Sequence, residues 1–106
     1  MSHFRTTEQA DEDLIAVYTQ GIERFGRRQA DLYFDRLYST FQRLADHPTL
    51  TRLRTEFDPP ARAFTFGSHV VLYDEEPEGI VIIRVRHAHE NWYEDPRGLD
   101  NEAGRP

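Results

Sequence analysis

The fold is decided by the stretch FGRRQADLY (residues 25–33) and by two apolar runs that follow it, HVVLY (residues 69–73) and IVIIRVRH (residues 80–87). The first stretch places a glycine between two amphipathic patterns, which predicts the turn of a helical hairpin. The two later runs predict a β-hairpin whose last strand carries arginine and histidine out to the sheet edge. This order of parts restricts the fold to a small set and favours protein binding over catalysis.

Two amphipathic helices flank the glycine. The first is predicted to begin with Thr6 as its N-cap, with Gln9 closing a capping box, and to end at Gly26 in a left-handed cap. The second is predicted over residues 28–46, because Pro48 terminates it. Because their connection is short, the helices must pack as an antiparallel hairpin. Each apolar stripe is wider than a partner helix covers, so a sheet should lie beneath them. The stripes are Ala10, Leu14, Val17, Tyr18, Gly21, Ile22 and Phe25, then Ala30, Tyr33, Phe34, Leu37, Phe41, Leu44 and Ala45.

The strand signals lie mostly in the second half of the chain. Residues 62–66, 69–73 and 79–87 are predicted strands, and a weaker signal at residues 3–6 suggests a short opening strand. Residues 80–83 are apolar at every position, which is typical of a central strand covered on both faces. From Arg84 onward the pattern changes to alternation, whereas residues 49–60 show no periodicity. We therefore expect an α+β fold of order β-α-α-β-β-β, with the helical hairpin packed on a small antiparallel sheet.

The composition bounds the class of protein. The 106 residues are expected to form one domain over residues 1–96, followed by a flexible acidic tail over residues 97–106. The chain contains no cysteine, no apolar run long enough to span a membrane and no apolar leader, so we expect a reduced, cytoplasmic setting. The net charge of −6 argues against a surface that neutralises many phosphates. Every cationic residue is arginine, which suits pairing with carboxylates, although codon usage in a GC-rich genome explains this bias equally well.

Several segments, in this order, carry a family resemblance: Phe25-Gly26 with Gln29-Ala30 and Tyr33, residues 44–48 (LADHP), Arg62, residues 69–73 and residues 82–87. Over residues 3–93 the chain resembles the ParE branch of the RelE/ParE toxins of bacterial toxin–antitoxin modules. The resemblance implies a toxin neutralised by an antitoxin with a ribbon-helix-helix DNA-binding part and a C-terminal segment that wraps the toxin. It also implies action on DNA gyrase by stabilising the cleaved-DNA intermediate. Operator DNA would be reached only through the ParD-like antitoxin, and no cofactor is expected.

The chain departs from the common ParE pattern at residues 88–91 (AHEN), which replace a more basic run. This departure keeps two alternatives open. One is a RelE-like endoribonuclease that cleaves messenger RNA on the ribosome, for which the candidates are Arg62, Arg84, Arg86, His87, His89 and Tyr93. The absence of lysine, the net charge of −6 and the nearby Glu90 and Glu94 argue against it. The other is a toxin without activity that remains as half of an autoregulating DNA-binding complex.

A metal site is a further alternative, because His87 and His89 lie on the same face of a strand. A third ligand on that face is not evident, so we expect no bound metal. Because we favour a protein that acts by binding, we also expect no catalytic residues.

The residues expected to act are therefore binding residues. For antitoxin contact we predict five arginines and three apolar anchors: Arg52, Arg54, Arg62, Arg84, Arg86, Leu50, Leu53 and Phe57. For target contact we predict the end of the last strand and the residues after it: His87, His89, Trp92 and Tyr93. Trp92 is the only tryptophan and is predicted to lie at an exposed edge, a residue type that often dominates interface energetics.

Overall fold

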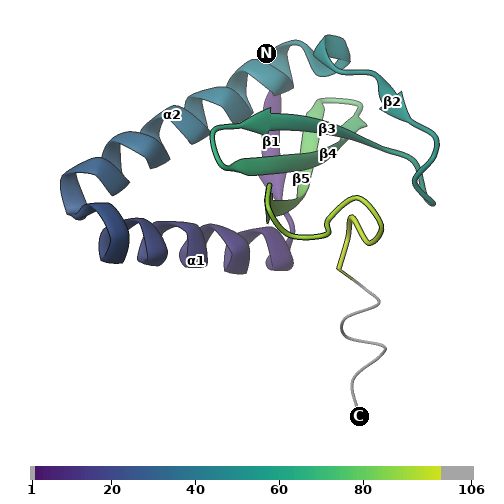
Figure 1. Cartoon of the computed structure of the whole chain (residues 1–106). Coiled ribbons are helices and arrows are strands. Elements are labelled where there is room, and N and C mark those ends of the chain that lie inside the picture. Colours follow the sequence, from purple (N-terminus) through teal and green to yellow (C-terminus); the bar gives the residue numbers. More distant parts are fainter. Residues whose placement is uncertain (1, 99–106) are drawn as a thin grey trace.

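The computed structural model of the chain describes residues 2–98, while Met1 and residues 99–106 of the predicted tail lie outside the described part. The elements follow in the order β1 (His3–Thr6), α1 (Glu8–Phe25), α2 (Arg27–Asp46), a 3₁₀ turn (Pro48–Leu50), β2 (Leu53–Arg54), β3 (Ala61–Phe66), β4 (His69–Glu76) and β5 (Gly79–His87). The strands form one sheet in the order β1-β5-β4-β3-β2. Figure 1 shows the two helices meeting at one end and opening toward the sheet. The predicted α+β fold is confirmed.

Two details of the sheet differ from the prediction. The sheet is mixed, because β1 pairs with β5 in parallel, with Phe4 opposite Ile80. A short strand in the aperiodic segment, β2, adds a fifth strand by pairing with β3, where Leu53 lies opposite Arg62. A four-residue strand and a two-residue strand carry too few side chains to reveal their pairing partner from periodicity alone.

The helical hairpin forms much as the sequence predicts. Gly26 joins the helices with φ 86°, a left-handed backbone that favours glycine, and its N–H donates to the carbonyl of Ile22. The N-cap of α1, however, is Thr7 and not Thr6, because Thr6 belongs to β1. The Thr7 hydroxyl accepts from the N–H of Ala10 at 3.1 Å and donates to the carbonyl of Ile83 at 2.7 Å. The cap therefore also attaches the start of α1 to β5.

The main core lies between the helices and the sheet. Burial of these side chains stabilises the fold by about 1.5–3 kcal/mol for each large one. The buried members are Ala10 and Leu14 of α1, Leu37, Phe41, Leu44 and Ala45 of α2, and Val71, Tyr73, Ile80, Ile82 and Val85 of the sheet.

A β-bulge in β5 decides which side chains reach this core. Leu72 lies opposite Arg84 but Tyr73 lies opposite Ile82, so Ile83 is an extra residue. The bulge resets the alternation, so that Ile82 and Val85 both face the helices. This explains the change of pattern at Arg84 in the sequence. It also divides β5, because β1 ends opposite Ile82 and the half that carries arginine and histidine continues past it at an edge, as predicted.

Asp13 of α1 binds the edge of β5 at the bulge. Its Oδ2 accepts from the backbone N–H of Val85 at 2.9 Å and from Nε of Arg84 at 2.7 Å, and its Oδ1 accepts from Nη2 of Arg84 at 3.0 Å. One carboxylate thus takes the place of a neighbouring strand for β5 and binds a guanidinium in two-pronged geometry.

A second, smaller core covers the face of the sheet away from the helices. Phe57, Ala61 and Leu72 are buried there, with Ile83 and Trp92 packed against them. The segment after β5 returns across this face, and Arg97, from the predicted tail, donates to the carbonyl of Pro59 at 2.8 Å. The predicted domain boundary at residue 96 stays a prediction. No helix in the part of the chain that the structure describes is long and apolar enough to cross a membrane.

Replacing Asp13 should destabilise the fold more than replacing its exposed neighbour Glu12. Asp13→Ala leaves the Val85 N–H and the Arg84 guanidinium without this acceptor, so we expect a loss of about 2–3 kcal/mol in the free energy of unfolding. Glu12→Gln should change it by less than about 0.5 kcal/mol. Urea denaturation of both variants measures the difference, and equal stabilities would refute the role of Asp13.

Candidate protein-binding site

The guanidinium groups of both β5 arginines bind acceptors within the chain. Arg84, in addition to its contact with Asp13, donates to the carbonyl of Arg97 at 2.5 Å. Arg86 is 4% exposed; it donates to Glu90 at 3.0 Å and to the carbonyls of Asp95 at 2.6 Å and Pro96 at 2.8 Å. Both guanidiniums therefore hold the segment after β5 against the sheet.

The arginines around β2 also have partners within the chain. Glu56 accepts from Arg54 at 2.8 Å and from Arg52 at 3.2 Å, and these hydrogen bonds lower its pKa to about 2. Arg62 donates to the carbonyl of Thr51 and to Glu75, the latter at 2.6 Å. Of this group Arg52 is the exposed member, whereas the side chain of Arg62 is 13% exposed.

The apolar residues predicted to contact a partner also divide into exposed and buried members. Leu50 and Leu53 are 46% and 44% exposed; Leu50 precedes β2 and Leu53 belongs to β2, the edge strand of the sheet. Phe57 is 4% exposed and belongs to the second core.

Trp92 packs inward while Tyr93 stays at the surface. The Trp92 ring lies 6.0 Å from the Phe57 ring, and its side chain is partly buried. Tyr93 is 48% exposed and its hydroxyl donates to Glu56 at 3.1 Å. The guanidinium of Arg54 lies over the rings of Phe57 and Tyr93, at 5.2 and 5.4 Å from their centroids. Trp92 therefore anchors its own chain, and Tyr93 is the aromatic surface that remains.

Three histidines stand in a row where the β4–β5 pair ends. The ring centroids of His69 and His87 are 5.2 Å apart, and those of His87 and His89 are 5.1 Å apart. The Tyr33 hydroxyl of α2 lies 2.6 Å from Nδ1 of His69 and accepts from the N–H of Ser68 at 3.2 Å. Burial, and then the nearby His87, lower the pKa of His69. Within residues 2–98, no three metal-ligating side chains form a group that would hold a metal ion.

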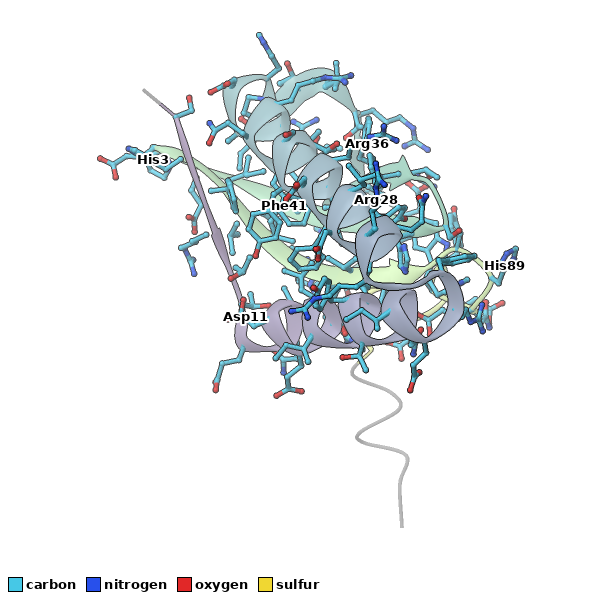
Figure 2. The ribbon with its side chains drawn as sticks, turned by 90° about the vertical axis from the view of Figure 1, so that its left-hand side faces the viewer. His3, Asp11, Arg28, Arg36, Phe41 and His89 are labelled. Carbon is cyan, nitrogen blue, oxygen red and sulfur yellow. The ribbon has the colours of Figure 1, made fainter. Side chains whose placement is uncertain are left out.

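The structure adds a surface that sequence reasoning did not single out, a cavity of about 390 Å³ between the helices and the histidine row. We call it the basic groove and define it by Arg24, Phe25, Ala30, Arg36, His69 and His87. Its floor forms where Gly21 lets α1 approach Ala30, since a Cβ there would stand 3.3 Å from that of Ala30. Phe25 is 70% exposed at its rim. Figure 2 shows Arg28 and Arg36 on the side of α2 that faces His89, with Asp11 on the other side.

The basic groove has the properties of a site for an acidic amphipathic segment. Among residues 2–98, Arg24 and Arg36 take part in no ion pair, in contrast to the arginines of β2 and β5. Apolar walls with unpaired guanidiniums at the rim suit a helix that has one apolar face and flanking carboxylates. The signal in the sequence was Phe25 beside Arg24, an apolar side chain at the tip of a hairpin where the core cannot reach it.

Protonation of His69 should destabilise the fold. Because its pKa is lowered in the folded protein, the unfolded chain binds this proton at a higher pH, near the ordinary value of about 6.5. The contribution of His69 to stability is therefore complete above that value and is lost as the pH falls below it. We expect the free energy of unfolding to decrease between about pH 7.5 and about pH 5.5, and His69→Asn to lessen that decrease. The control is His47→Gln, which replaces an exposed histidine after α2, and an equal effect of both substitutions would contradict this role of His69.

Comparison with known proteins shows the family to which the chain belongs. The family model described as ParE toxin of type II toxin-antitoxin system, parDE, matches residues 4–92. A protein described as Toxin ParE1, from Caulobacter vibrioides, is 32% identical over 87 residues, which is 82% of this chain and 90% of the relative. Toxin ParE3 of the same organism is 33% identical over 79 residues, covering 74% and 79%.

A solved structure described as Chromosomal ParDE TA system from P. aeruginosa has the same fold, with a TM-score of 0.71 at 19% identity, covering 84% of this chain and 98% of that one. The family match extends over most of the chain, from β1 to the segment after β5. The chain therefore belongs to the ParE toxin family of type II toxin–antitoxin systems.

Proposed function

We propose that this ParE-family toxin inhibits DNA gyrase by binding, without covalent chemistry of its own, and that a ParD-like ribbon-helix-helix antitoxin neutralises it in the cytoplasm. Operator DNA is reached only through the antitoxin. The observation that supports the proposal is that Arg84 and Arg86, in this member of the family, already donate hydrogen bonds to acceptors of their own chain. These are the β5 cations that a nuclease of this fold would need for phosphate.

The alternative is a RelE-like ribosome-dependent endoribonuclease. Such an enzyme needs cations free to stabilise the developing charge and an acid–base group near them. The pair His69 and His87, beside the basic groove, is the feature that favours it. Against it, Nδ1 of His87 accepts from the N–H of His89 at 3.2 Å, and the net charge of −6 opposes entry into the RNA of a ribosome.

The antitoxin is proposed to use two surfaces of the toxin. An acidic amphipathic helix occupies the basic groove, with carboxylates toward Arg24 and Arg36. An extended segment follows the open edge at β2, where Leu50, Leu53 and Arg52 are exposed. The other predicted contacts, Arg54, Arg62, Arg84, Arg86 and Phe57, would support these surfaces from within, because they already have partners in the chain.

The gyrase-facing surface is proposed to lie where β5 ends. His87, His89 and Tyr93 supply its accessible groups, and Trp92 holds the segment in place from below. The replacement of a basic run by residues 88–91 makes this surface less cationic than the family pattern implies, so shape and aromatic contact rather than charge would carry recognition.

Two assays on the same purified chain test the mode of action. We expect it to abolish supercoiling by DNA gyrase and to leave in vitro translation intact. Tyr93→Ala should raise the concentration needed for inhibition by about tenfold, as expected for an exposed aromatic contact. As a control, Tyr18→Ala truncates an aromatic side chain of the helical hairpin, outside the proposed gyrase-facing surface. Blocked translation with normal supercoiling would instead support the endoribonuclease, and no effect in either assay would support a toxin without activity.

Reversing one charge in the basic groove should weaken antitoxin binding. We expect Arg36→Glu to lower affinity for the antitoxin encoded beside this gene by about tenfold, or about 1.4 kcal/mol. Arg43→Glu makes the same charge change further along α2, outside the groove, and should have little effect. Calorimetric titration at low and high salt measures both. Equal losses for the two variants would contradict this placement of the antitoxin helix.

A further inference from the structure

The helical hairpin has a second groove, on the side opposite to the basic groove. It is a cavity of about 640 Å³ between α1 and α2, and we call it the acidic groove. The side chains that matter for its chemistry are Asp11, Ile15, Tyr18, Asp31, Asp35 and Tyr38. Tyr18 and Phe34 line both grooves and form the wall between them.

The acidic groove combines exposed apolar surface with aromatic rings. Ile15 is 67% exposed and Tyr38 is 40% exposed, although both lie on helices whose other faces pack into the core. The rings of Tyr18, Phe34 and Tyr38 form a ladder with centroid separations of 5.3 and 5.1 Å. Aromatic faces attract cations, and guanidinium groups stack on them most readily.

The rim carries charge of one sign. Asp11 accepts a hydrogen bond from Thr6 and Asp31 accepts one from Tyr18, both at 2.5 Å, and within residues 2–98 none of the three aspartates forms an ion pair. No cation is among the lining residues that the structure describes. Arg27 interacts with the Tyr18 hydroxyl, which in turn donates to Asp31. A cationic ligand therefore has its best position toward Asp11 and Asp35.

The same chain shows how such a surface holds an arginine. On the far side of the molecule, the Arg54 guanidinium lies over Phe57 and Tyr93 while Glu56 accepts its hydrogen bond. The acidic groove has the same components, aromatic rings flanked by carboxylates, and no arginine is among its lining residues in the part of the chain that the structure describes.

We propose that the acidic groove binds an arginine-bearing amphipathic helix of a partner protein. The apolar face of that helix packs on Ile15 and Tyr38, and its arginines reach the rings and the three aspartates. The lining spans α1 from Asp11 to Thr19, which corresponds to about 12 Å, or two to three turns of a docked helix. The partner's charge is opposite to that of the segment proposed for the basic groove, so one ligand cannot serve both sites equally.

The probe for this proposal is a designed helical peptide with leucines at positions i, i+4 and i+7 and arginines beside them. A twin peptide carries glutamate in place of every arginine. The ¹⁵N-labelled full chain is titrated with each peptide, and amide shifts locate the contact. We expect the arginine peptide to perturb residues of α1 and α2 around Ile15 and Tyr38, and the glutamate twin to leave them unperturbed.

Matched charge variants separate the groove from general attraction to an acidic protein. Asp11→Asn with Asp35→Asn should weaken binding by at least about tenfold. Asp58→Asn with Glu78→Gln removes two exposed negative charges elsewhere and should weaken it less than about twofold. Ile15→Ala, at an exposed position, should also reduce affinity. Absence of binding, equal losses in the two double variants, or shifts centred on another surface would each overturn the proposal.

Discussion

The contact of the Asp13 carboxylate with Arg84 and with the Val85 N–H joins the two halves of the molecule. β1 pairs with β5 only as far as Ile82, so within residues 2–98 the next part of β5 has no strand on that side. The Asp13 carboxylate accepts hydrogen bonds there in place of a strand, and these bonds attach α1 to β5 at the bulge. The geometry of the bulge then directs Arg84 and Arg86 to the face away from the helices, where they hold the segment after β5 through its carbonyls. A carboxylate on the first helix therefore supports Arg84, one of the two arginines that hold the segment after β5.

The distribution of arginines follows from this arrangement. Those of β2 and β5 have partners within the chain, and the second core depends on them to keep the returning segment in place. Arg24 and Arg36, which form no ion pair within residues 2–98, lie on the helical hairpin and line the basic groove. A chain with a net charge of −6 thus presents one cationic groove and, across the wall formed by Tyr18 and Phe34, one acidic groove. Net charge alone conceals this separation, because opposite charges gather on opposite sides of the same pair of helices.

Much of the fold was predictable from local pattern. The positive φ of Gly26 and the change of alternation at Arg84 each depend on neighbours in sequence, and the structure confirms them. The predicted helix stripes reach the core only in part, because Ile22 and Phe25 at the end of α1 are 37% and 70% exposed. The parallel pairing of β1 and the addition of β2 depend on contacts between distant segments, which periodicity does not record. The same limit applies to the candidate site. An arginine in a strand or loop looks identical in sequence whether it faces a partner or a carbonyl of its own chain, and only the tertiary structure separates Arg86 from Arg36.

This distinction bears on how the protein acts. Catalysis at the end of β5 would require guanidiniums that change partners during the reaction, whereas Arg84 and Arg86 each hold several acceptors that keep the domain packed. Freeing them for a phosphate would release the segment after β5 and expose the second core around Phe57 and Leu72. The same contacts favour binding, because they hold the surface that His89 and Tyr93 present in one conformation and so reduce the entropy lost on association. Rigid support of a small aromatic surface is what a protein needs when its effect depends on remaining bound.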